Sequence, residues 1–120
     1  MARFHYTILS RALPGREEEF VTWYRDQHIA DVCRMPGVIG GELFRMDFQR
    51  VYDLDAAPQW TLMAIYQLEG DDPEAIIDSL RAASGSAQMP ACAAIDKSGM
   101  IQAAGHRIAS GGAAANSDRG

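Results

Sequence analysis

Apolar and polar side chains alternate near the start of the chain with the two-residue period of a β-strand. Two sets of residues define the faces of this strand, which we expect over 3–10: Phe4, Tyr6 and Ile8 on one side, and His5, Thr7 and Leu9 on the other. Comparable patterns predict the remaining elements in this order: a helix over 16–35, strands over 38–51 and 60–68, a helix over 73–83 and a strand over 99–108.

Residues that favour or forbid helical backbone mark the ends of these elements. Pro14-Gly15 breaks the first strand, and the acidic residues at 17–19 stand where the first helix begins, at the positive end of its dipole. Pro36-Gly37 ends that helix, because the residue before a proline is pushed out of the helical region. Asp72-Pro73 is a capping residue followed by a favoured first helical residue. The helix boundaries are therefore predicted from local chemistry alone.

The element order is β-α-β-β-α-β, which is typical of the ferredoxin-like α+β fold. We expect a four-stranded antiparallel sheet with two helices on one face, formed by a domain over residues 1–109. Residues 110–120 are rich in Gly, Ala and Ser and are predicted to be a flexible tail. Since the strands over 3–10 and 60–68 are apolar on both faces, a second copy is expected to cover the other face and form a homodimer, sheltering Tyr6 or Tyr66.

Composition excludes several classes of protein. With 48% hydrophobic and 22% charged residues the chain is typical of folded domains, and its net charge of -5 argues against a nucleic-acid partner. No apolar stretch approaches the roughly 20 residues that span a bilayer, so we expect a cytoplasmic protein without a membrane partner. Cys33 and Cys92 are too few for a disulfide framework or a zinc site, and both are predicted to be free thiols.

The first helix carries the most informative pattern. At about 100° per residue, a narrow stripe points toward the sheet and contains Val21, Tyr24, His28, Val32 and Met35. His28 lies at its centre, and Asp31 stands where it could orient the imidazole ring, which suits a general acid or base. The alternative is a core histidine satisfied by a backbone carbonyl or a hydroxyl. The same geometry places Trp23 and Cys33 on the far side of the helix.

This helix resembles the first helix of EthD-like proteins, over residues 13–45. The resemblance rests on Glu19-Phe20, Trp23-Tyr24, His28, Asp31-Val32 and Met35-Pro36-Gly37. It implies a dimeric α+β barrel in which His28 faces a cavity between sheet and helices. The group includes lactone isomerases and polyketide cyclases. The related antibiotic-biosynthesis monooxygenases share the fold and also work without metal or flavin, so the resemblance leaves the reaction open.

Several further residues are candidates for the site. Glu42 shares the face of its strand with Val38 and Phe44, and a carboxylate in apolar surroundings could shuttle protons beside His28; alternatively the neighbouring glycines turn it into water. The candidate substrate-binding residues are Tyr6, Tyr24, Asp31, Phe44, Tyr66, His5 and His106. The two strand histidines could equally lie at the surface, and three histidines are thin evidence for a metal, so none is expected.

These observations favour an enzyme that needs no cofactor and moves a proton on a small, hydrophobic, oxygenated compound, aromatic or polyketide-like. An isomerase, cyclase or lyase would fit, with His28 as base or acid. Three alternatives remain open: a cofactor-free monooxygenase of the same fold, a dimer that binds a hydrophobic metabolite or haem, and a purely structural dimer.

Overall fold

A computed structural model describes residues 2–52 and 60–112 of the chain. The elements follow in chain order: β1 (Arg3–Ala12), α1 (Glu17–Trp23), the π-helix η1 (Tyr24–His28), α2 (Ile29–Cys33), β2 (Val38–Arg45), β3 (Leu62–Glu69), α3 (Pro73–Ala83) and β4 (Ile95–Gly105). The predicted element order is confirmed. The loop that the sequence predicts around residues 53–58 and residues 113–120 of the expected tail lie outside the described residues.

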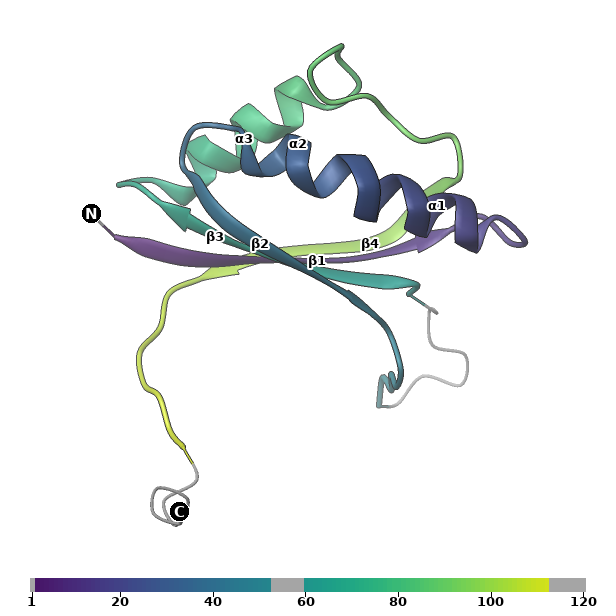
Figure 1. The fold of residues 1–120 in the computed structure, drawn as a ribbon. Helices are drawn as coiled ribbons and strands as arrows, with labels where there is room; N and C mark the ends of the chain where they lie inside the picture. Colours follow the sequence, from purple (N-terminus) through teal and green to yellow (C-terminus); the bar gives the residue numbers. More distant parts are fainter. Residues whose placement is uncertain (1, 53–59, 113–120) are drawn as a thin grey trace.

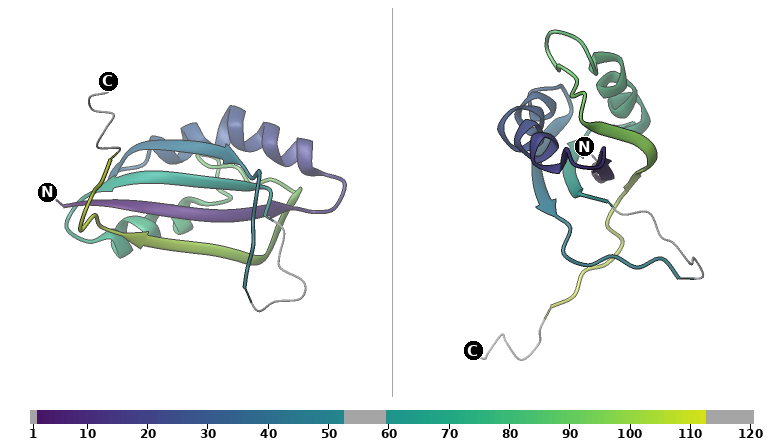
Figure 2. Two further views of the ribbon diagram at one scale, coloured as in Figure 1. Left: turned by 90° about the horizontal axis from the view of Figure 1, so that it is seen from below. Right: turned by 90° about the vertical axis from the view of Figure 1, so that its right-hand side faces the viewer.

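The four strands form one antiparallel sheet in the order β2-β3-β1-β4 (Figure 2). All helices lie on one face of this sheet, and the other face is open (Figure 1). We call the latter the open face. This is the ferredoxin-like α+β fold predicted from the sequence. None of the helices in the described part of the chain is long and apolar enough to cross a membrane.

Local chemistry fixes the ends of the helices much as expected. The Asp72 carboxylate accepts hydrogen bonds from the backbone N–H groups of Glu74 and Ala75, and Pro73 opens α3. Gly37 adopts a φ of +88°, a left-handed conformation that suits glycine and turns the chain into β2. The two larger boundary differences are in strands: β2 ends at Arg45 rather than near residue 51, and β4 begins at Ile95 rather than at residue 99.

The core lies between the sheet and the helices. Tyr6 of β1 and Tyr66 of β3 are register partners with 3% and 0% exposure, and they pack beneath Phe20 of α1. The expectation that Tyr6 or Tyr66 needs shelter from a second copy is therefore wrong, because the helices already cover both. By strand alternation, the apolar residues on the open face are instead Leu9, Phe44, Met63, Ile65 and Ile101.

Candidate functional site

A cavity of about 470 Å³ lies between the first helix, the end of α3 and the strands β1 and β4. Trp23, Tyr24 and His28 line it from the first helix. The remaining lining residues come from the other three sides: Ile8, Ser10, Arg81, Ser84, Ala91, Cys92, Ile95, Lys97, Met100 and Gln102. His28, the residue predicted to carry the chemistry, thus contacts a cavity large enough for a small ring compound.

The π-helical turn η1 brings Trp23 onto His28. The Ile29 N–H donates to the Tyr24 carbonyl, five residues earlier, in place of the four-residue step of an α-helix. The Trp23 and His28 rings consequently stack with their centroids 4.3 Å apart and their planes 18° apart. The expectation that Trp23 lies on the far side of the helix is wrong, because it assumed a regular α-helical turn.

The His28 ring is packed from two sides. Besides Trp23, the Tyr24 ring meets it edge-on at 4.8 Å between centroids, with an interplanar angle of 90°. Burial disfavours the charged imidazolium and lowers the pKa of His28 to about 4, while the negative charge of Asp31 partly opposes this. The ring nitrogen Nδ1 is buried and has no hydrogen-bond partner among the residues that the structure describes. At neutral pH, His28 is therefore an uncharged imidazole that can accept a proton.

Asp31 is not the orienting partner expected from the sequence. It is 6% exposed, and its Oδ1 pairs with Arg34, one turn further along the helix. Its Oδ2 is buried without a partner, and Asp31 does not line the cavity. The carboxylate acts on His28 through its charge rather than through a hydrogen bond.

The three candidate tyrosines divide between the cavity and the core. Tyr24 lines the cavity, and its hydroxyl accepts a hydrogen bond from the Tyr66 hydroxyl at 3.2 Å. Burial raises the pKa of Tyr24 to about 12 and also raises the pKa values of Tyr66 and Tyr6. Tyr6 and Tyr66 lie in the core beneath and do not line the cavity. All three hydroxyls therefore remain protonated at neutral pH. Of the three tyrosines, only Tyr24 lines the cavity.

Glu42 and Phe44 lie on the open face, on the opposite side of the sheet from His28. The register of β2 with β3 shifts between Val38 and Gly40, which confirms the irregularity expected at the glycines. Because of this extra residue, Val38 points toward the helices whereas Glu42, opposite Ile65, points away from them and is exposed. The prediction that Glu42 acts beside His28 is therefore wrong, and the exposure of Glu42 agrees with the alternative that the neighbouring glycines turn it into water. Phe44 is 39% exposed and lies outside the cavity.

His5 and His106 do not contribute to the cavity either. His5 pairs with Gly105 across β1 and β4, so the two histidines do occupy neighbouring segments, as expected. His5 points to the open face, and His106 follows the end of β4 and is exposed. Within residues 2–52 and 60–112, no group of three potential metal-binding side chains is present.

Among the lining residues, the sequence reasoning named only Tyr24 and His28, and those it missed include Ser10, Trp23, Arg81 and Lys97. Ser10 could have been found, because it continues the face of Tyr6 and Ile8 on β1. Trp23 could not, since no residue type marks the π-helical turn. Arg81 and Lys97 meet the cavity only through the packing of α3 and β4, which no local pattern encodes.

Comparison with known proteins supports the fold. No family model and no curated protein matches the sequence. A crystal structure from Shewanella loihica PV-4, described as a "putative monooxygenase", has 14% identity and a TM-score of 0.56, covering 91% of this chain and 97% of that one. An EthD family protein from Bacillus halodurans C-125 has 18% identity and a TM-score of 0.53, covering 88% of this chain and 99% of that one. This chain therefore shares the ferredoxin-like fold of an EthD family protein, as the resemblance of its first helix implied.

Proposed function

We propose that this protein is a cytoplasmic enzyme that needs no cofactor and moves a proton on a small oxygenated ring compound bound in the cavity. The observation that carries the proposal is the imidazole of His28 on the cavity wall, packed against Trp23 and Tyr24, where burial lowers its pKa. A base and hydrogen-bond donors suffice for an isomerase, cyclase or lyase that works by proton transfer.

The low pKa of His28 limits the compounds from which it can remove a proton. A base whose conjugate acid has a pKa of about 4 removes protons efficiently only from carbon atoms whose C–H bond is strongly activated. A carbon between two carbonyl groups, as in polyketide-like compounds, or a ring position whose deprotonation yields an aromatic product, meets this condition. The Tyr24 hydroxyl, with its raised pKa, stays protonated and can donate a hydrogen bond to the enolate oxygen that forms.

We also propose that the protein forms a homodimer through the open face. Phe44 is 39% and Ile101 44% exposed on this face, and both lie beside the apolar side chains of Met63 and Leu9. The segments 46–52 and 106–112 leave the sheet on the same side (Figure 1). Phe48 on the first of these is 69% exposed. A second sheet packed against this face would bury these side chains.

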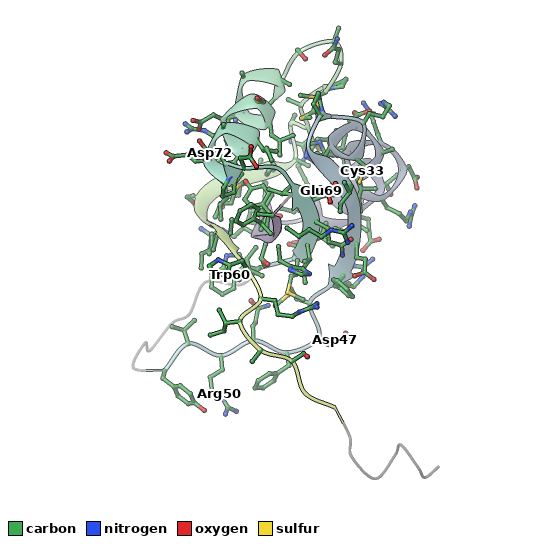
Figure 3. The ribbon with its side chains drawn as sticks, turned by 90° about the vertical axis from the view of Figure 1, so that its left-hand side faces the viewer. Cys33, Asp47, Arg50, Trp60, Glu69 and Asp72 are labelled. Atoms are coloured by element: carbon green, nitrogen blue, oxygen red, sulfur yellow. The ribbon has the colours of Figure 1, made fainter. Side chains whose placement is uncertain are left out.

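Figure 3 shows Asp47 and Arg50 on the segment after β2, away from the body formed by the helices.

Sedimentation at micromolar concentration tests the homodimer, and a monomer would contradict it. The charge-introducing variant Ile65→Glu on the open face should produce a folded monomer.

Proton transfer can be tested with nitrobenzisoxazole, a flat apolar compound that measures the presence of a base in a cavity. The base takes the ring C–H proton, the electron pair forms the nitrile, and the N–O bond breaks to give a coloured cyanonitrophenolate. The purified protein, without added metal or flavin, should catalyse this ring opening at a rate above that of buffer. No rate above buffer would contradict a usable base in the cavity.

A cofactor-free monooxygenase is the second candidate, favoured by the likeness in fold to the Shewanella loihica PV-4 structure. The two proposals differ in whether the reaction consumes dissolved oxygen. A proton-transfer enzyme turns over its compounds at the same rate under argon, whereas an oxygenase consumes dissolved oxygen in proportion to product. An oxygen electrode in a screen of β-dicarbonyl and phenolic compounds separates them. A visible absorption band on addition of haem would instead favour the haem-binding alternative.

A further inference from the structure

The charged residues of the cavity wall are all cations. Arg81 reaches the cavity from the end of α3 and Lys97 from β4, and no Asp or Glu of the described residues lines it. The whole chain, by contrast, carries a net charge of -5, and Lys97 is its single lysine. An acidic protein has thus placed positive charge alone around this cavity, which favours an anionic occupant.

Neither of these two cations donates a hydrogen bond to a carboxylate of the described residues. Six other arginines have a carboxylate oxygen within hydrogen-bonding distance: Arg3, Arg11, Arg16, Arg25, Arg34 and Arg45. The nearest carboxylate oxygen to Arg81, on Asp78, is 3.9 Å away, which is too long for a hydrogen bond. Lys97 forms no ion pair with any residue in 2–52 or 60–112. Its neighbour Asp96 pairs with Arg11 instead.

Two residues of the same wall have buried donors that lack a partner in the described part of the chain. The Ser10 hydroxyl belongs to a residue that is 2% exposed, and neither it nor the Trp23 indole N–H has a partner among the described residues. An indole N–H, an ammonium and a guanidinium can only donate hydrogen bonds. The matching ligand must therefore be rich in acceptors, and an oxyanion has the highest acceptor capacity for its size.

The rest of the wall is largely apolar and partly aromatic, with Ser84 and Gln102 as its further polar residues. Ile8, Ile95 and Met100 line the cavity opposite the aromatic pair of Trp23 and His28. From this arrangement we infer that the cavity binds a conjugated ring compound that carries an oxyanionic group, of which a carboxylate is the simplest. Its ring lies among the apolar side chains, and its oxyanion faces Arg81 and Lys97. This inference rests on the proposed function, because it specifies the substrate of the same cavity.

The test compares cinnamate with cinnamamide, which has the same shape and conjugated ring but no charge. Isothermal titration with the full-length protein at low salt should show that cinnamate binds more tightly by about tenfold, or about 1.4 kcal/mol. In the double variant Arg81→Gln/Lys97→Gln, this preference should disappear while the affinity for cinnamamide stays the same. The matched control Arg3→Gln/Arg45→Gln removes the same charge from β1 and β2, outside the cavity, and should retain the preference.

Each outcome bears on a different part of the inference. Equal affinities for the two compounds in the unmodified protein would overturn the inference. The proposed function would still stand, because His28 can act as a base on an uncharged compound. If the double variant still prefers cinnamate, the proposal that Arg81 and Lys97 bind the oxyanion is wrong. If neither compound binds at millimolar concentration, the inference falls together with the small-molecule cavity. Ring opening of nitrobenzisoxazole, which is neutral, reports on His28 independently of the two cations.

Discussion

The indole ring of Trp23 lies face to face on the imidazole of His28, with 4.3 Å between centroids, although the two residues are five positions apart. In a regular α-helix this spacing would separate them around the helix axis. The π-helical turn η1 instead brings them together, and such turns occur frequently at functional sites. The Trp23 side chain is thus part of what keeps His28 out of water and uncharged.

Shortening Trp23 should return the pKa of His28 toward the ordinary value of about 6.5, because removal of the stacked ring admits water. In Trp23→Leu, an NMR titration of the imidazole should therefore show a midpoint well above the value of about 4 expected for the native protein. The control is Trp60→Leu, since Trp60 donates to the Gly99 carbonyl and does not line the cavity. An unchanged His28 midpoint in Trp23→Leu would show that other groups cause the shift.

Stability should fall on acidification through the titration of His28. The folded pKa is about 4 and the unfolded one about 6.5, so between these values the unfolded chain binds more protons. As the pH falls from about 6.5 to 4, the titration of His28 should lower the free energy of unfolding by up to about 3 kcal/mol. Above about pH 6.5, the contribution of His28 should no longer change with pH.

His28→Phe isolates this contribution, because all other titrating groups are common to both proteins. Urea unfolding at several pH values should show that the variant gains stability relative to the native protein as the pH is lowered, since phenylalanine has no charged form to bury. A difference between the two proteins that does not vary with pH would contradict a buried, neutral His28.

Gly41 tests the packing that supports the site from below. A Cβ atom at this position would lie 2.7 Å from Cδ1 of Tyr66, whose hydroxyl bonds to Tyr24. Gly41→Ala should destabilise the protein by about 1–3 kcal/mol in chemical unfolding, through overpacking. Gly105→Ala is the matched control, as its added Cβ would meet nothing within 4 Å. Equal stability of the two variants would mean that the Tyr66 ring moves freely.

The sequence predicts the fold well because the fold depends on local signals. Alternation identifies β1 and β3, and Asp72-Pro73 locates the start of α3. Two local irregularities limited the prediction of the site. The π-helical turn rotates Trp23 onto His28, and the bulge before Gly40 reverses the face of Glu42. Each adds a residue to a regular period, and nothing in residue type announces it, so a pattern argument assigns the wrong face beyond that point.

The cations of the cavity illustrate a different limit. Arg81 and Lys97 are 16 residues apart in the sequence, on α3 and β4, but tertiary packing brings both to one wall. Neither residue lies in a motif, and both would read as ordinary surface charges. Only the tertiary structure places both on the wall of one cavity.

The most direct test of the account compares nitrobenzisoxazole ring opening by the native protein and by His28→Ala, at equal concentration and neutral pH. We expect the variant to remain folded by circular dichroism and to lose about 10²- to 10⁴-fold in kcat/KM, the range for removal of a general base. His5→Ala, on the open face, is the matched control and should retain full activity. Undiminished ring opening by a folded His28→Ala would contradict the assignment of His28 as the base.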